Sequence, residues 1–218
     1  VGGYVGTGGT VKDLSVSGTV SGRMYVGGVV GDNRGSISAS ASVTNCYNTG
    51  KVTGSAASSN VGGVVGLNRG SVENCYNTGS VSGVSPVGGV VGDNRGTVEN
   101  CYNTGTVTGT DDYVGGVVGW NRGTVTGCYF LKQDGLSSGA TAVDDLNALC
   151  ENFESVTDTW TIHPVLDRPV LNENKEGGLG TEASPYQIST ATQLKNFATA
   201  VNGGDTDAHA VLMDNIDL

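Results

Sequence analysis

A unit of about 26 residues, seen most clearly in Val61–Gly83, recurs through the first 130 residues of the chain. Its opening Val-Gly-Gly is found at five positions, separated by 25, 35, 26 and 27 residues: Val1, Val26, Val61, Val87 and Val114. Extra residues in Ser38–Thr44 account for the longest spacing. A period in the twenties is typical of stacked repeats, in which one unit cannot bury its apolar face alone and neighbouring units complete the core.

Each unit contains three runs rich in β-formers, namely Val61–Gly66, Ser71–Asn77 and Ser80–Ser82. Asn-Arg-Gly and Asn-Thr-Gly separate them, and we interpret these as corners because Asn and Gly tolerate positive φ. The Leu-x-x-Leu-x-Leu frame of leucine-rich repeats is absent. The pattern therefore predicts an all-β protein, a parallel β-helix (β-solenoid) of about five coils with short capping helices.

The repeated residues also carry a family resemblance. Gly-Gly-Val-Val-Gly followed by Asn-Arg-Gly-Ser/Thr-Val-Glu-Asn-Cys-Tyr-Asn-Thr-Gly resembles the GLUG motif, a repeat of large bacterial surface and secreted proteins. The motif is named for Gly-Leu-hydrophobic-Gly, and this chain has valine at the Leu position: Val29, Val64, Val90 and Val117. The resemblance implies a β-solenoid on the exported side of a cell, found in adhesins and beside peptidases. It implies no chemistry for the repeat itself.

Composition excludes several classes of protein. With 37 Gly and 6% aromatic residues among 218, the chain cannot build an ordinary core on large side chains. A net charge of −10 makes duplex nucleic acid and anionic membranes poor partners. No run of 18 apolar residues, initiator Met, signal peptide or sorting sequence is visible. We therefore expect a piece of a longer protein, and only the resemblance indicates its location, extracellular or at the cell surface.

The domain organisation follows from where the repeat stops. Residues 1–131 are predicted to form the solenoid, beginning with a degenerate coil in which Gly9–Gly18 aligns with Gly70–Gly79 and Leu14 occupies the Cys position. Residues 132–172 are interpreted as a C-terminal cap that covers the last strand edges.

The predicted cap contains one helix and two strands. Leu146, Leu149, Cys150 and Phe153 have helical spacing, with Thr141 and Asp144 as a capping box. The strands are expected at Thr159–Ile162 and Arg168–Leu171.

Residues 173–180 are polar and Gly-rich and read as a linker. Residues 181–218 then start a following module. They contain a helix capped by Ser189 or Thr190 and stopped at Gly203, and a strand at Ala210–Leu218.

Four cysteines are predicted to stack in a core ladder about 4.8 Å apart: Cys46, Cys75, Cys101 and Cys128. Buried thiols are favoured, because the spacing exceeds the roughly 3.8 Å between Cβ atoms of a disulfide. Disulfides stay an alternative, and a metal site is a weaker one because no Cys-x-x-Cys occurs. Cys150 belongs to the apolar face of the predicted helix.

Four arginines form a candidate ligand-facing row on one corner: Arg34, Arg69, Arg95 and Arg122. The simpler interpretation is a solvated polar turn, whose charge is offset by nearby acidic residues: Asp32, Asp93, Glu73 and Glu99. The functional interpretation is a row that binds a carboxylate-bearing glycan or an acidic protein segment. A tyrosine column is expected to stabilise the coils rather than to serve as a sugar platform: Tyr47, Tyr76, Tyr102 and Tyr129.

Catalytic motifs find little support. Gly135–Gly139 matches Gly-x-Ser-x-Gly without a strand-to-helix elbow, and only His163 and His209 could act as a base. No His-Glu-x-x-His is present, and Gly178–Ala183 imitates a dinucleotide fingerprint outside any βαβ unit. Calcium at Asp205 and Asp207 is a weaker interpretation than a solvated loop. No cofactor, metal or catalytic residue is expected.

These observations predict a non-catalytic structural or adhesive module of an exported bacterial protein. We expect it to be part of a tandem array, with head-to-tail self-association or tandem neighbours and a glycan or protein ligand. The alternative is an accessory domain of a secreted peptidase or polysaccharide-active enzyme. A lyase in its own right ranks third, since lyase sites need side chains that differ between coils, and these coils are near copies.

Overall fold

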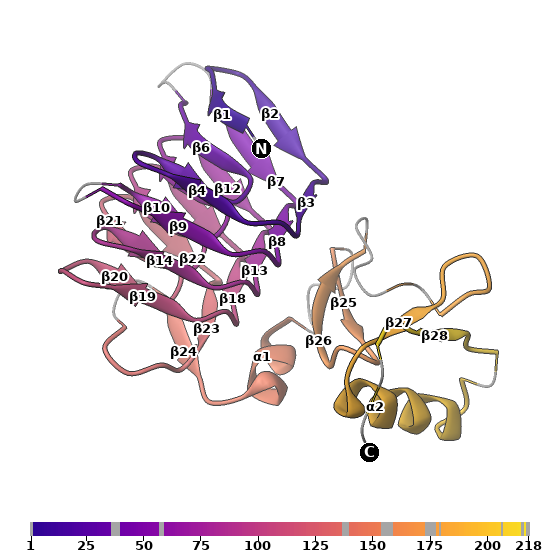
Figure 1. Ribbon diagram of the computed structural model, residues 1–218. Helices are drawn as coiled ribbons and strands as arrows, with labels where there is room; N and C mark the ends of the chain where they lie inside the picture. The colour runs from indigo at the N-terminus through magenta and orange to yellow at the C-terminus, as the bar shows by residue number, and fades with distance from the viewer. Residues whose placement is uncertain are drawn as a thin grey trace. The chain divides into compact units, whose positions relative to one another are not determined.

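The computed structural model describes residues 2–35, 40–56, 59–136, 140–153, 159–172, 178, 180–205, 207–214 and 216. The chain divides into two compact units, Val1–Asp145 and Leu146–Leu218. Unit 1 is a stack of β-coils (Figure 1).

Five parallel sheets make up unit 1. Sheet A contains β1 (Gly2–Val5), β6 (Val30–Asn33), β11 (Val65–Asn68), β16 (Val91–Asn94) and β21 (Val118–Asn121). Sheet B contains β2 (Thr10–Lys12), β7 (Ser42–Thr44), β12 (Ser71–Glu73), β17 (Thr97–Glu99) and β22 (Thr124–Thr126). Sheet C contains β3 (Ser15–Val16), β8 (Tyr47–Asn48), β13 (Tyr76–Asn77), β18 (Tyr102–Asn103), β23 (Tyr129–Leu131) and β24 (Thr141–Val143). Sheet D contains β4 (Val20–Gly22), β9 (Val52–Gly54), β14 (Val81–Gly83) and β19 (Val107–Gly109). Sheet E contains β5 (Val26–Gly27), β10 (Val61–Gly62), β15 (Val87–Gly88) and β20 (Val114–Gly115).

Neighbouring coils pair equivalent residues, as in Val61 with Val87 and Tyr76 with Tyr102. The predicted parallel β-helix is therefore confirmed. Each internal coil, such as β10 to β14, uses five short strands rather than the predicted three. The backbone turns at Gly63, between β10 and β11, and at Asn74, whose φ is 52° between β12 and β13. A continuous strand cannot pass through a positive φ.

The first coil has a different register from the one predicted. Gly2 pairs with Val30 and Val5 pairs with Asn33, so the Val-Gly-Gly at Val1 is not equivalent to the one at Val26. A Gly-rich corner, closed by the Gly9 N–H to the Gly6 carbonyl at 2.9 Å, separates β1 from β2. This longer corner absorbs the mismatch before Thr10, which pairs with Ser42 as the alignment of Gly9–Gly18 predicts.

Small side chains fill the interior of unit 1. One cluster contains the valines of sheets A and B with four cysteines, and a second lies between sheets D and E. Val64, Val72 and Val90 are fully buried. Each buried valine stabilises the fold by about 1.5–3 kcal/mol relative to an exposed one. The coils thus build a core from many valines instead of a few large residues.

The solenoid continues beyond the predicted end at residue 131. β24 pairs with β23, placing Thr141 beside Tyr129. The predicted start of the helix at Thr141 is therefore wrong, because this backbone is used in the sheet. The helix α1 (Leu146–Phe153) begins where the helical apolar spacing begins.

Unit 2 contains α1, an antiparallel pair β25 (Trp160–His163) and β26 (Arg168–Leu171), and a parallel pair β27 (Tyr186–Ile188) and β28 (Ala210–Leu212) joined by α2 (Ala191–Asn202). Helix α1 packs on β25, where Phe153 and Trp160 meet edge to face at 4.9 Å.

The second helix follows its sequence signals. The Thr190 hydroxyl accepts a hydrogen bond from the Gln193 N–H at 3.2 Å, and Gly203 follows the last helical residue. The strand after it is shorter than predicted and ends at Leu212.

The two units do not follow the predicted domain boundaries. The predicted cap, residues 132–172, spans the division at Asp145. The predicted linker, residues 173–180, lies mostly outside the described residues. That residues 146–172 cap the solenoid stays a prediction.

Candidate functional site

The four arginines of the row follow the last residue of four strands of sheet A: Arg34, Arg69, Arg95 and Arg122. Their backbone N–H groups each donate to a carbonyl of the preceding coil at 2.7–2.9 Å. The corners therefore stack in register, and the structure brings the four arginines into one column.

Beneath this column lies a ladder of buried asparagine amides. Asn33 Nδ2 donates to Asn68 Oδ1 at 2.9 Å, and Asn68 Nδ2 donates to Asn94 Oδ1 at 2.8 Å. Asn68 Oδ1 also accepts from the Gly70 N–H at 3.1 Å, which closes the corner. A second ladder joins Asn48, Asn77 and Asn103.

Sequence reasoning assigned these asparagines to positive-φ corners and missed the ladders. The described asparagines with positive φ are instead Asn60 and three that precede cysteines: Asn45, Asn74 and Asn100. The missed signal was an asparagine at the same position in successive internal coils, with glycine two residues later.

Two buried aspartates hold most of the arginine row. In sheet A, register aligns Asp32, Leu67, Asp93 and Trp120. Arg34 Nε donates to Asp32 Oδ2 at 2.7 Å. The pKa of the Arg34 guanidinium is raised, chiefly by this hydrogen bond and by the charge of Asp32.

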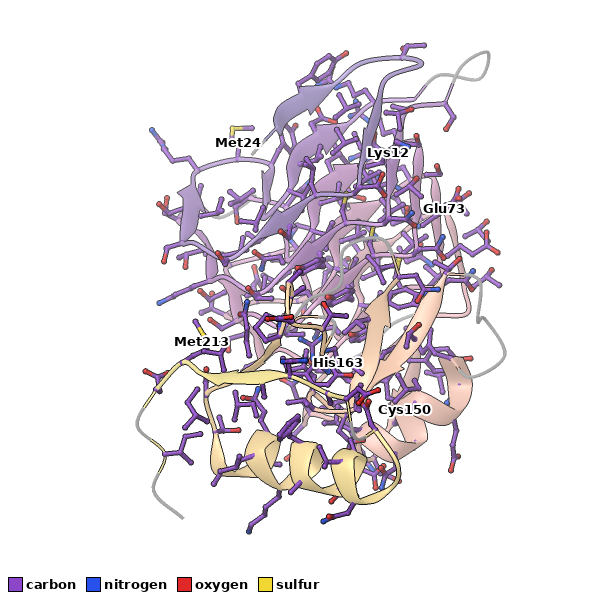
Figure 2. The ribbon with its side chains drawn as sticks, turned by 90° about the vertical axis from the view of Figure 1, so that its right-hand side faces the viewer. Lys12, Met24, Glu73, Cys150, His163 and Met213 are labelled. Atoms are coloured by element: carbon purple, nitrogen blue, oxygen red, sulfur yellow. The ribbon has the colours of Figure 1, made fainter. Side chains whose placement is uncertain are left out.

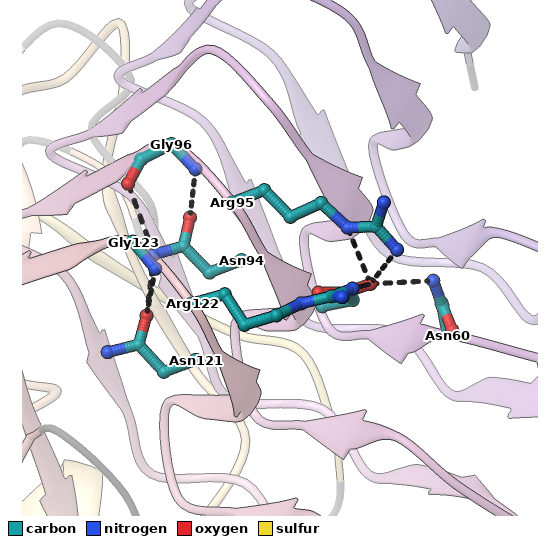
Figure 3. Close-up of polar contacts among 8 residues, drawn as sticks. Asn60, Asn94, Arg95, Gly96, Asn121, Arg122 and Gly123 are labelled. Atoms are coloured by element: carbon teal, nitrogen blue, oxygen red, sulfur yellow. Dashed lines mark hydrogen bonds and ion pairs between the residues drawn. The ribbon is translucent and has the colours of Figure 1, made fainter.

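Asp93, only 1% exposed, is shared between coils. Figure 3 shows its partners Asn60, Arg95 and Arg122, whose polar groups point toward one common acceptor. Its Oδ2 accepts from Arg95 Nη2 at 2.9 Å and from Arg122 Nη2 at 2.8 Å, with Asn60 Nδ2 at 3.5 Å. Hydrogen bonds between charged groups are stronger than neutral ones, so this carboxylate links two coils to the corner before Val61.

Arg69 differs from the other three members of the row. The position two residues before it, which is aspartate in two other coils, is occupied by the buried Leu67. Within the described ranges, Arg69 forms no ion pair, and its side chain is half-buried. Its planar guanidinium can therefore offer paired donors to an external carboxylate.

Aromatic rings flank the row at both ends. Arg122 lies 3.8 Å above the Trp120 ring, and Tyr113 stacks on Trp120 at 5.0 Å. At the other end, Arg34 lies 5.4 Å from the Tyr4 ring. Together with Arg69, these rings present cationic and aromatic groups, which suit an acidic sugar or peptide.

The tyrosine column is stacked as predicted. Tyr47 and Tyr76 stack at 4.7 Å, and Tyr76 and Tyr102 at 5.0 Å, with nearly parallel rings. Tyr129 pairs with Tyr102 in sheet C. Because Tyr76 and Tyr102 are buried, their rings are not open to a sugar.

The cysteine ladder lies in the core, and its members are free thiols: Cys46, Cys75, Cys101 and Cys128. Each Sγ donates to the carbonyl two residues earlier at 3.1–3.3 Å. Burial raises the pKa of the Cys75 and Cys101 thiols well above the ordinary value. The hydrogen bond with Cys101 raises the pKa of Cys128, while the hydrogen bond with Cys75 lowers the pKa of Cys46.

The histidines and aspartates considered for catalysis or metal binding lie in unit 2. His163 is buried in unit 2, where its Nδ1 accepts the N–H groups of Val165 and Leu166 at 3.2 and 3.1 Å. His209, Asp205 and Asp207 are exposed, and part of Gly135–Gly139 lies outside the described residues. No group of three His, Cys, Asp or Glu residues in the described ranges is placed to hold a metal.

No helix formed by the described residues is long and apolar enough to cross a membrane.

A comparison with known protein families identifies the same repeated unit in this chain. The GLUG motif matches residues 22–53, 57–82 and 85–108, so the chain carries GLUG repeats. No curated protein matches the chain. A similar solved structure, a candidate immunoglobulin A1 protease from Bacteroides ovatus, has 23% sequence identity and a TM-score of 0.62. The match covers 78% of this chain and 62% of that protein, and it supports the β-helix fold alone.

Proposed function

We propose that this GLUG-repeat β-helix is a non-catalytic structural and adhesive module of an exported bacterial protein, with its ligand held at the arginine corner. The observation that carries the proposal is the repetition of one corner in register, in which Arg69 forms no ion pair within the described ranges. GLUG motifs occur in secreted proteins, which supports an extracellular or cell-surface location.

The ligand that fits this corner is a carboxylate-bearing glycan or an acidic protein segment. Asp93 already holds Arg95 and Arg122 in ion pairs, so Arg69 offers the guanidinium of the row that no described carboxylate holds. Trp120 is already in contact with Arg122 and Tyr113, whereas the exposed ring of Tyr113 can pack against a sugar ring or an apolar side chain. The net charge of −10 opposes acidic ligands at long range, so recognition depends on this local contact.

The test is titration of the full chain with oligogalacturonate, a carboxylate-bearing glycan. We expect Arg69→Gln to weaken binding at least about tenfold, or ~1.4 kcal/mol, in line with a charged hydrogen bond. Arg23→Gln removes the same charge from an exposed residue outside the row and should bind like the wild type. Methyl-esterified oligogalacturonate, which lacks the charges, should bind weakly.

Two results would contradict the ligand proposal. One is equal binding by Arg69→Gln and the wild type. The other is binding that is unchanged by added salt, because exposed ion pairs are screened.

A second candidate function is an accessory β-helix domain of a secreted peptidase or polysaccharide-active enzyme. The observation in its favour is the structural similarity to the candidate protease from Bacteroides ovatus. Sequencing the surrounding gene separates the candidates. A catalytic domain encoded beside this chain favours the accessory role, whereas further GLUG coils favour a tandem array with head-to-tail neighbours.

A further inference from the structure

A buried histidine joins the antiparallel and the parallel strand pairs of unit 2. His163, the last residue of β25, is 4% exposed and lies inside this unit (Figure 2). Its ring meets that of Tyr186 in β27 edge to face, with 5.2 Å between the ring centres. Its Nδ1 accepts the backbone N–H groups of Val165 and Leu166, so the proton of the neutral ring is on Nε2. Nε2 lies 3.3 Å from the Gly178 carbonyl oxygen and donates to it.

The turn that this ring organises carries contacts to the rest of unit 2. Val165, inside the turn, is fully buried in a cluster with Tyr186 and Ile188 of β27. Asn196 Nδ2 of α2 donates to the Val165 carbonyl oxygen at 3.2 Å. The segment from β27 to β28 thus docks on the β25–β26 pair through this turn, and the conformation of the turn depends on Nδ1 of His163.

Protonation of His163 is incompatible with the observed turn. An imidazolium carries N–H groups at both ring nitrogens, so Nδ1 would point a proton at two backbone N–H groups and accept neither. Both backbone donors would then lose their acceptor, which destabilises the turn. The proton would also bring a charge next to an apolar cluster, where charges are costly.

Among the described residues, the charged residue directly opposite His163 is a cation. This residue, Arg168, pairs with His163 in the β25–β26 ladder, and like charges on opposite residues destabilise an antiparallel pair. The pKa of Tyr186 is raised by burial, and to a lesser extent by Asp205, so this ring is neutral in acid. The other described charged or titratable side chains of the surrounding elements, apart from the Cys150 thiol, are exposed, and solvent screens their charges: Glu151, Asp167, Lys195, Asp205, Asp207 and His209.

We propose that unit 2 contains an acid-sensitive latch, in which protonation of His163 at Nδ1 opens the turn Pro164–Asp167 and releases the β27–α2–β28 segment from the β25–β26 pair. A free imidazole is half-protonated near pH 6.5, whereas the docked ring uses Nδ1 as an acceptor. The open state therefore binds the proton. Below about pH 6.5, its population relative to the docked state rises by up to about tenfold for each unit of pH. The latch goes beyond the proposed binding function and does not involve the arginine corner.

Amide hydrogen exchange of the full chain, followed by NMR, measures this opening. The protection factor is the ratio of intrinsic to observed exchange rate, so the pH dependence of the exchange chemistry cancels. Between about pH 7.5 and pH 5, the protection factors of the Val165 and Leu166 amides should fall by about thirtyfold. Core amides of unit 1, such as those of Val64 and Val90, should keep their protection, which excludes unfolding of the whole chain.

Two variants assign the effect, because the chain contains two histidines. In His163→Asn, the amide oxygen can replace Nδ1 as an acceptor but does not titrate. The protection factors of Val165 and Leu166 should therefore be equal at the two pH values. His209→Asn is the matched control, since His209 is exposed and its loss should leave the thirtyfold change intact.

Equal protection of the wild-type turn at the two pH values would overturn the latch, as would an acid-induced loss that persists in His163→Asn or disappears in His209→Asn. A proton on Nδ1 of His163 at about pH 7.5, detected by nitrogen NMR, would overturn it as well. If His163→Asn is unprotected at both pH values, the control decides. Histidine is the side chain whose unperturbed charge changes between about pH 5 and 8, so a loss that persists in His209→Asn comes from His163.

Discussion

In the described residues, the first and last coils of unit 1 differ in how far their side chains are covered. At the N-terminal end, residues equivalent to buried positions of internal coils are open to solvent, such as Leu14, 40% exposed, at the position of the fully buried Cys46. At the C-terminal end, Leu136 packs against both hydrophobic clusters of unit 1, and Ala140 packs against one of them.

Polar groups are also covered at the C-terminal end. Gln133 Oε1 accepts from the Val107 N–H and its Nε2 donates to the Gly105 carbonyl, both at 3.1 Å. β24 then covers β23 in sheet C. Residues outside the repeat therefore cover the last coil of unit 1, whose strand edges would otherwise be open. A coil can therefore form all its strands and still leave side chains exposed, as Leu14 shows.

The largest expected effect compares a glycine inside the stack with one at the open end. Gly62→Ala would place a Cβ 2.0 Å from the Val65 oxygen and 2.7 Å from the Val90 oxygen, both backbone atoms. We expect a loss of about 3 kcal/mol or more in the free energy of unfolding. Gly3→Ala meets nothing within 4 Å and should change stability by less than about 1 kcal/mol.

Urea unfolding followed by circular dichroism measures both glycine variants. Similar losses would mean that the first coil is as tightly packed as the interior, which would contradict the difference between the ends.

A smaller effect compares one leucine at each end. Leu136→Ala removes contacts with both clusters and should cost about 2 kcal/mol, the low end for a core leucine because Leu136 is half-buried. Leu14→Ala removes the same atoms from an exposed site and should cost less than about 1 kcal/mol. Thermal unfolding of both variants tests the ranking, and an equal or reversed order would show that residues 132–143 do not cap the core.

The sequence was sufficient to predict the coil, the interior register and the cysteine column, because a repeated valine pattern has few ways to bury itself. Helix α2 was equally predictable, since Thr190 and Gly203 mark its ends. These features depend on local spacing or on repetition.

Features that depend on contacts between coils could not be predicted. Each asparagine of a ladder bonds to the equivalent asparagine of the next coil. The sequence of a single coil therefore shows only residues typical of turns. The burial of Asp93 depends on Arg122 of the next coil and on Asn60 of the preceding one. The register of β1 was not predicted, because a Gly-rich corner can be longer by some residues while the spacing of the Val-Gly-Gly segments stays nearly the same.

The smallest effect concerns the cysteine ladder, which crosses the solenoid from one end to the other. Cys101→Ser should cost only about 1 kcal/mol, because the hydroxyl can keep the hydrogen bond to the Glu99 carbonyl while the apolar contacts of sulfur are lost. Urea unfolding of this variant checks the value. A loss above about 3 kcal/mol would mean that the hydroxyl finds no partner.

The order in which the native thiols react compares local opening at the two ends of the cysteine ladder more directly than the stability of one variant does. All four ladder thiols should label slowly with a neutral disulfide reagent, since reaction requires local opening. Cys46 should react first, because only the exposed Leu14 coil lies beyond it and the pKa of its thiol is lowered by the hydrogen bond with Cys75. Cys128 lies at the other end, where the Thr141 N–H donates to its carbonyl at 2.9 Å and β24 must open before it reacts. Peptide mapping of partly labelled protein gives the order. If Cys128 reacts as fast as Cys46, the C-terminal end opens as readily as the N-terminal one, and capping by residues 132–143 does not distinguish them.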